Sequence, residues 1–177
     1  MVNLVGLVLC GGESRRMGRD KGLLLKDGIP WGLHIGRKLD RWVEVFYSIN
    51  QRQEEAYRTI LPDDRLITDA TDLPGPLNGL FSLHRRMPDT DILLVACDML
   101  DLDEVTIATL ISAWQLTELD FVAYGDGQLW QPFCSIYTSR GLKTAASRVS
   151  LQKILREGRT HRLTMHEPAA FANYNHP

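Results

Sequence analysis

Hydrophobic and polar positions along the chain form two recurring patterns. Short apolar runs bounded by turn residues are typical of strands in a covered sheet, and they occur at residues 4–10, 43–49, 65–68, 91–97, 121–124, 130–137 and 162–165. Apolar positions spaced by three or four residues indicate helices, and this spacing predicts helices at residues 31–39, 53–61, 80–87, 103–114, 139–147 and 151–156.

Strands and helices therefore alternate along most of the chain. This alternation predicts an α/β fold, a three-layer α/β/α sandwich around a mainly parallel, Rossmann-like sheet. No repeat or low-complexity linker divides the sequence, so we expect one domain over residues 1–177. In such folds ligands bind at the carboxyl ends of the strands. The residues that directly follow each strand are therefore the candidates for function.

Composition and charge exclude several classes of protein. The 177 residues are 44% hydrophobic and 24% charged, with a net charge of −2, which gives no sign of a nucleic-acid partner. No apolar run is long enough for a membrane span, and none is expected. Cys10, Cys97 and Cys134 are widely spaced, without a CxxC pair, and lie in or beside apolar runs. Buried free thiols in a reducing cytoplasm are the expected arrangement.

A glycine-rich basic loop follows the first predicted strand. Gly11 and Gly12 let the backbone approach a ligand, and exposed N–H groups can surround phosphate oxygens, with the Ser14 hydroxyl beside them. Four cations follow within seven residues, as a triphosphate requires: Arg15, Arg16, Arg19 and Lys21. The loop lacks the Gly-Lys-Ser/Thr ending of a P-loop and the GxGxxG of a dinucleotide site. A solvated basic turn is the alternative, and it leaves this convergence unexplained.

Asp98 is a lone carboxylate directly after the apolar run 91–97. Mg²⁺ prefers oxygen ligands, usually one or two carboxylates plus substrate phosphates. A cap of the next helix is the alternative for such an Asp, but Asp101 and Asp103 are better placed for capping. We therefore expect Asp98 to bind the metal.

The basic loop also carries a family resemblance. Its sequence, LCGGESRRMGRDKGLL, resembles the N-terminal signature of the MobA-type molybdenum cofactor guanylyltransferases, LxGGxSxRMGxDK, without a gap. The signature is specific for the wider NTP-transferase superfamily, whose fold is that of the nucleotide-diphospho-sugar transferases. The paired glycines and the Asp20-Lys21 ending resemble the guanylyl branch more than the cytidylyl relatives.

Further stretches extend the resemblance over nearly the whole chain. Residues 48–50 are similar to the family's (S/N)AN segment, and residues 72–80 to xxPGPLAGL with Asn78 in place of Ala. Residues 96–99 resemble the metal-binding PCDxP turn without its prolines. Gln131, with the residues that follow it, resembles the acceptor-side strand, and residues 173–177 are similar to NxNTPE with His176 in place of Thr.

The resemblance implies a Mg²⁺-dependent transfer of GMP from GTP to molybdopterin or molybdenum-molybdopterin, with release of pyrophosphate. It also implies possible partners among other proteins of cofactor biosynthesis or molybdoenzyme maturation. The expected catalytic residues are Arg16, Lys21 and Asp98, with Asp98 as the metal ligand. The expected nucleotide-binding residues are Leu9, Cys10, Gly11, Gly12, Ser14, Lys21, Asn50, Asp69 and Asp98. The expected acceptor residues are Gln131, Arg156, Arg159 and Asn175.

Several alternatives stay open at the level of sequence. Asp69 fits a turn-forming residue as well as a ribose or metal contact, and Arg156 and Arg159 fit a solvated helix end as well as an acceptor site. Trp130 could stack on a pterin, although packing in the core explains it better. A relative that uses CTP or a sugar phosphate is an alternative function, and so is a non-catalytic nucleotide-binding protein. The missing prolines around Asp98 and the altered tail keep the non-catalytic alternative open.

Overall fold

The computed structural model describes residues 3–11, 20–145 and 150–174. Within them, seven strands form one sheet in the order β5-β4-β1-β6-β8-β7-β9. β1 pairs in parallel with β4 and β6, β4 with β5, and β7 with β9. β8 is antiparallel to both of its neighbours, β6 and β7. The mainly parallel sheet predicted from the sequence is confirmed.

The elements of this sheet follow the predicted segments closely. The strands are β1 (Asn3–Leu9), β4 (Glu44–Ile49), β5 (Leu66–Thr68), β6 (Thr90–Ala96), β7 (Phe121–Gly125), β8 (Trp130–Tyr137) and β9 (Thr160–Leu163). The helices are α1 (Trp31–Leu39), α2 (Glu54–Arg58), α3 (Pro76–Arg86), α4 (Glu104–Leu116), α5 (Ser139–Ala145) and α6 (Leu151–Glu157). Short 3-10 turns are η1 (Lys21–Leu23), η2 (Gln51–Gln53), η3 (Asp63–Arg65) and η4 (Pro168–Phe171).

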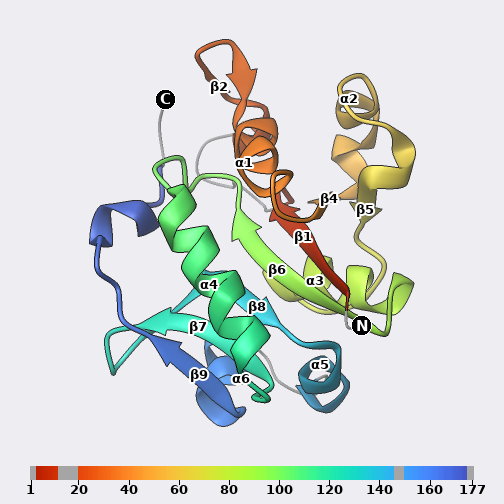
Figure 1. Cartoon of the computed structure of the whole chain (residues 1–177). Coiled ribbons are helices and arrows are strands. Elements are labelled where there is room, and N and C mark those ends of the chain that lie inside the picture. The colour runs from red at the N-terminus through yellow and green to blue at the C-terminus, as the bar shows by residue number, and fades with distance from the viewer. Residues whose placement is uncertain (1–2, 12–19, 146–149, 175–177) are drawn as a thin grey trace.

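Helices cover both faces of the sheet, so β1 and β6 are buried on both sides. Along β1, Leu4 and Val8 pack into one apolar cluster with α1 and α4, and Val5 and Leu7 pack into another with α3, α5 and α6. Figure 1 shows α4 in front of the sheet and α3 and α6 behind it. This double burial is the physical reason for the nearly unbroken apolar runs of these two strands.

Two elements differ from the sequence prediction. A small hairpin of β2 (Leu25–Lys26) and β3 (Ile29–Pro30) precedes α1. Its strands are too short for a periodic pattern, although Asp27 and Gly28 at its tip both have positive φ, as a two-residue hairpin turn requires. The helix predicted at residues 80–87 instead begins at Pro76, because Gly75 adopts a φ of 56° directly before it and turns the chain into the helix.

The strand directions bring the candidate loops to one edge of the sheet. β7 is parallel to β6 because both are antiparallel to β8. The carboxyl ends of β1, β4, β5 and β6 therefore share an edge with the start of β8. We call this the carboxyl edge. In the described part of the chain, no helix has both the length and the apolar character that a membrane crossing needs.

Candidate functional site

Backbone hydrogen bonds join the loops along the carboxyl edge. Cys10 N and Gly11 N both donate to the Ser48 carbonyl, at 2.9 and 2.7 Å, so the chain after β1 stays against the end of β4. Asp69 N donates to the Ile49 carbonyl in the same way at 3.1 Å. The ends of three neighbouring strands are thus fixed relative to one another before any side chain is considered.

Lys21 and Asp98 meet at this edge from segments 77 residues apart. Lys21 Nζ lies 3.0 Å from Asp98 Oδ2, and the two side chains are only 22% and 14% exposed. The ammonium also donates to the Tyr174 carbonyl at 3.2 Å. A cation and a carboxylate that are partly shielded from water attract more strongly than an exposed pair. The structure therefore brings together two of the three residues that the sequence named as catalytic.

The turn that carries Asp98 is held from several sides. Met99 N closes the turn on the Ala96 carbonyl at 3.3 Å. From α1, Lys38 Nζ donates to the carbonyls of Leu100 and Leu102, at 2.6 and 2.7 Å, and burial lowers the pKa of this lysine. This contact of Lys38 could not be predicted from the sequence, because it depends on the packing of α1 against the loop.

Asp98 is not the cap of the helix that follows it. The N-cap of α4 is Asp103, whose carboxylate accepts from Thr106 N at 2.7 Å. This confirms that Asp103 caps the helix and leaves the Asp98 carboxylate for another role.

The tail of the chain returns to the Asp98 turn. Tyr174 N donates to the Asp98 carbonyl at 3.0 Å, and the Tyr174 hydroxyl donates to the Asp101 carboxylate. Segments 76 residues apart in the chain, at Asp98 and Tyr174, therefore meet beside Lys21. Asn175, predicted to contact the acceptor, lies outside the described residues, as do Gly12, Ser14 and Arg16.

The donor set around Asp98 fits a magnesium ion that shares its ligands with a substrate. Among the described residues, no group of three or more His, Cys, Asp or Glu side chains could hold a metal by itself. Mg²⁺ ordinarily takes one or two carboxylates and completes its shell with phosphate oxygens and water. A single carboxylate at the edge where phosphates are expected meets that requirement.

The predicted nucleotide-binding residues of the described segments border the same edge. Leu9 and Cys10 are buried, so they can offer a ligand only backbone groups. Asn50 directly follows β4, and its side-chain oxygen caps the η2 turn by accepting from Arg52 N at 3.0 Å. Asp69 is half-buried after β5, and burial raises its pKa.

Asn78 fixes the loop between β5 and α3. Its side-chain oxygen accepts from Thr71 N at 3.1 Å, from Thr71 Oγ1 at 2.9 Å and from Ser82 Oγ at 3.1 Å. Its amide nitrogen donates to the Thr71 carbonyl at 2.8 Å. The sequence marked this position only as a departure from the family's Ala. In the structure, the Asn78 side chain makes four hydrogen bonds that hold the loop after Asp69.

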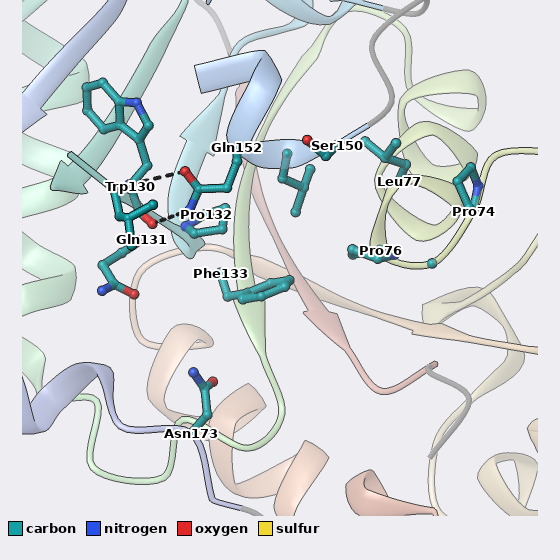
Figure 2. A pocket seen from close by; sticks show the side chains of 13 residues that line it. Pro74, Pro76, Leu77, Trp130, Gln131, Pro132, Phe133, Ser150, Gln152 and Asn173 are labelled. Atoms are coloured by element: carbon teal, nitrogen blue, oxygen red, sulfur yellow. Dashed lines mark hydrogen bonds between the residues drawn. The ribbon is translucent and has the colours of Figure 1, made fainter. Parts of the chain in front are cut away.

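A pocket of about 570 Å³ opens between α3, the start of β8 and the start of α6. Figure 2 shows the amides of Gln131 and Asn173 across the pocket from Pro74 and Pro76, with the Phe133 ring between them. An apolar cavity with a few polar groups is typical of a small-molecule site. The structure places Gln131 in this pocket and adds Asn173, which the sequence had connected to the site only as the start of the tail motif.

Gln152 holds one wall of this pocket in place. Its side chain accepts from Trp130 N at 3.2 Å and donates to the Trp130 carbonyl at 2.6 Å, which joins α6 to the start of β8. The Trp130 ring itself lies under the Arg162 guanidinium, 4.3 Å from its centre, and is almost fully buried. This agrees with packing as the role of Trp130.

Arg156 and Arg159 are not brought into the pocket. Arg156 is exposed on the last turn of α6, whereas only the first turn of that helix lines the cavity. Arg159 precedes β9 at the amino edge of the sheet, where it contacts Asp120 Oδ2 at 3.1 Å and the Glu118 carbonyl at 2.7 Å. The residues predicted for the acceptor therefore do not all lie together. Gln131 lines the pocket at the carboxyl edge, whereas Arg159 lies at the amino edge.

Comparison with known proteins agrees with this arrangement. The family model for the MobA-like NTP transferase domain matches residues 6–165. A molybdenum cofactor guanylyltransferase of Pseudomonas putida (strain GB-1) is 32% identical over 179 residues, which cover 97% of this chain and 92% of that protein. Another, from Pseudomonas entomophila (strain L48), is 35% identical over 158 residues, covering 84% of this chain and 80% of that protein.

A solved structure supports the fold. The molybdopterin-guanine dinucleotide biosynthesis protein A of Archaeoglobus fulgidus gives a TM-score of 0.77 at 17% identity, over 97% of this chain and 92% of that one. The family model covers most of the chain, and the Pseudomonas putida relative is similar over nearly its whole length. The chain is therefore a nucleotidyltransferase that belongs to the MobA-like NTP transferase family.

Proposed function

We propose that this nucleotidyltransferase transfers GMP from GTP to molybdopterin or its molybdenum-bound form and releases pyrophosphate. The observation that carries the proposal is the meeting of Lys21 and Asp98 at the carboxyl edge, 3.0 Å apart. A positive group for phosphates and a carboxylate for a metal are what phosphoryl chemistry requires at one place. The choice of GTP and of the acceptor is supported by the relatives that are named guanylyltransferases.

The reaction proceeds by in-line attack of the acceptor's phosphate oxygen on the α-phosphorus of GTP. The bond from that phosphorus to the bridging oxygen breaks, and pyrophosphate leaves with the electron pair. Such a transfer depends on positioning and charge neutralisation more than on covalent help from the protein. Lys21 neutralises the phosphate charge, and the backbone at Gly11 faces the phosphates. Asp98 would hold a Mg²⁺ ion, which would supply electrostatic stabilisation of the phosphate oxygens.

The acceptor binds in the pocket between α3, β8 and α6. Its apolar wall of Pro74, Pro76 and Phe133 suits a flat ring system, and the amides of Gln131 and Asn173 suit the polar edge of a pterin. Asn173 lines the pocket, and its neighbour Tyr174 contacts both Lys21 and Asp98, which supports transfer between two substrates bound side by side. Three buried free thiols support a reducing, cytoplasmic location.

The test is pyrophosphate release by the purified protein with Mg²⁺ and each of GTP, CTP and ATP, with and without molybdopterin. Release that requires both GTP and molybdopterin supports the proposal. Release with CTP retains the chemistry and overturns the base choice. No release from a folded protein under any of these conditions contradicts the proposed activity. Loss of release with EDTA, and its return with added Mg²⁺, tests the metal separately.

A further inference from the structure

A buried glutamine lies beneath the nucleotide side of the site. Gln53 ends the η2 turn and is only 9% exposed. Its amide nitrogen donates to the Cys10 carbonyl at 3.1 Å and to Asp20 Oδ2 at 2.6 Å. Its amide oxygen accepts from Asn50 N at 2.8 Å. One side chain thus connects three segments that are separate in the sequence.

Each of these contacts lies next to a group assigned to the nucleotide. Cys10 directly precedes Gly11, where the phosphate-facing backbone begins, and Asn50, one of the expected nucleotide-binding residues, directly follows β4. Asp20 directly precedes Lys21, and its other oxygen accepts from Gly22 N at 2.9 Å, capping the η1 turn that Lys21 begins. The Tyr57 hydroxyl donates to that same oxygen at 3.3 Å.

The arrangement requires an amide at position 53 for a chemical reason. The amide nitrogen Nε2 donates to the Cys10 carbonyl and to the Asp20 carboxylate. The amide oxygen Oε1 accepts from the backbone N–H of Asn50. Only an amide of this length offers two donors on one atom and an acceptor on the other. Any side chain that cannot donate leaves the Cys10 carbonyl and Asp20 Oδ2 without this donor in a place that is at least partly buried, which is costly.

We infer that Gln53 is a positioning residue for the nucleotide, which holds the Gly11 backbone, Asn50 and Lys21 in one geometry. The inference rests on the proposed function, because it assumes that these three segments bind GTP. Gln53 contacts none of the reacting atoms and acts through Cys10, Asn50 and Asp20. Its loss should therefore change the Kd and KM for GTP and leave the KM for molybdopterin unchanged.

Gln53→Glu tests this with the smallest change of shape. The introduced carboxylate still accepts from Asn50 N, but near pH 8 it faces the Asp20 carboxylate and the Cys10 carbonyl without a proton. We expect the Kd for GTP to rise about tenfold or more at that pH. Gln51→Glu is the matched control, since it adds the same charge to an exposed position of the same turn.

A change of pH distinguishes positioning from a general loss of packing. Burial already raises the pKa of Asp20, and a second carboxyl beside it should share a proton with it at a raised apparent pKa. As the pH falls from about 8 toward about 5.5, the pair takes up a proton and restores one donated hydrogen bond, so the Kd ratio of Gln53→Glu to Gln51→Glu should fall toward one.

Among the described residues, the titratable side chains that interact with Asp20 by charge or hydrogen bond include Tyr57 and Cys97. Burial raises the pKa of Tyr57, and a hydrogen bond with Cys10 together with burial raises that of Cys97. Tyr57 and Cys97 therefore stay neutral from about pH 5.5 to about pH 8.

A second variant reverses the polarity of the central hydrogen bond. Asp20→Asn combined with Gln53→Glu lets the new amide at position 20 donate to the new carboxylate at position 53, while its oxygen still accepts from Gly22 N and Tyr57. This double variant keeps the net charge of the wild-type protein. We expect it to bind GTP more tightly than Gln53→Glu alone near pH 8, by about tenfold.

The outcomes separate the inference from the proposed function. A wild-type protein that binds GTP, with Gln53→Glu equal to Gln51→Glu at every pH and no gain in the double variant, overturns the positioning role alone. A KM for molybdopterin that changes as much as the KM for GTP overturns it as well. A wild-type protein that neither binds GTP nor releases pyrophosphate overturns the proposed function, and the positioning role with it.

Discussion

Among the described residues, Asp98 is the one that we propose as the metal ligand. Asp98→Asn keeps the shape of the side chain but removes the charge that attracts both Mg²⁺ and Lys21. We expect kcat to fall on the order of 100-fold or more, because stabilisation of developing charge is the largest contribution to such a reaction. The Kd for GTP should change much less. Steady-state pyrophosphate release together with calorimetric GTP binding measures both.

A control for this variant is Asp64→Asn, which removes an exposed carboxylate in η3, away from the carboxyl edge. It should leave kcat and the Kd for GTP at their wild-type values. If Asp98→Asn behaves like this control, Asp98 has no part in the mechanism.

Lys21 differs from Asp98 in acting on binding as well as on turnover. Its ammonium lies between Asp98 Oδ2 and the Tyr174 carbonyl, where triphosphate oxygens are expected. Lys21→Ala should raise the KM for GTP and lower kcat, together on the order of 100-fold in kcat/KM. Lys26→Ala is the matched control, because Lys26 is more exposed and approaches Asp101 only at 3.9 Å. Unchanged kinetics for Lys21→Ala would exclude a role in phosphate binding.

At the scale of elements, Asn78 holds the loop from β5 to α3 through side-chain hydrogen bonds. Asn78→Ala removes all four of its side-chain hydrogen bonds and leaves the Thr71 backbone groups without partners. We expect the free energy of unfolding to fall by about 1–3 kcal/mol, the usual cost of unpaired groups in a partly buried place. Urea unfolding measures this, with exposed Asp72→Ala in the same loop as the control. Equal stability of the two variants would mean that the Asn78 network contributes nothing.

The elements themselves could be predicted where burial alone decides the pattern. β1 and β6 have apolar residues on both faces because helices cover both sides of the sheet, and that condition is visible in the sequence. The β2–β3 hairpin could be found only from its Asp27-Gly28 turn, since two-residue strands have no period. The start of α3 could not be predicted, because it depends on the φ of Gly75 and the sequence of this loop is compatible with several conformations.

The site was predictable to the extent that strand ends determine it. Asp98 could be named because it follows the apolar run of β6 directly. Lys21 could be named because it ends the basic loop that follows β1. Gln53 carried a local signal, since its spacing from Asn50 is that of a capping box. Lys38 carried none, because its two carbonyl partners lie 62 and 64 residues away. Contacts of that kind follow from how helices pack and not from local sequence.

At the scale of the whole molecule, the two edges of the sheet carry different groups of side chains. The carboxyl edge holds Lys21, Asp98 and the pocket, and the amino edge holds an ion-pair cluster of Asp120, Arg140 and Arg159. The cluster connects the starts of β7, α5 and β9 through one carboxylate. The sequence assigned Arg159 to the acceptor, but Arg159 lies before β9 at the amino edge, where it contacts Asp120.

This division predicts that the amino edge affects stability without affecting catalysis. Burial of the Asp120 carboxyl alone would raise its pKa, but hydrogen bonds and charge from Arg140 and Arg159 outweigh burial and lower it. A lowered pKa in the folded state means that the cluster stabilises the protein above the ordinary carboxyl pKa of about 4 and loses this effect as the pH falls toward the lowered value. Asp120→Asn should therefore lower the melting temperature at neutral pH, and the difference from the wild-type protein should vanish at strongly acid pH.

Arg159→Gln tests stability and acceptor binding in one variant. Both arginine side chains of the cluster are largely exposed, so the loss should be at most about 1 kcal/mol at neutral pH. The KM for molybdopterin should stay at the wild-type value, because Arg159 lies at the edge opposite the pocket. Arg156→Gln, on exposed α6 surface, should change neither quantity. A raised acceptor KM in Arg159→Gln, without one in Arg156→Gln, would show that the acceptor reaches the amino edge and that the two edges share the catalytic task.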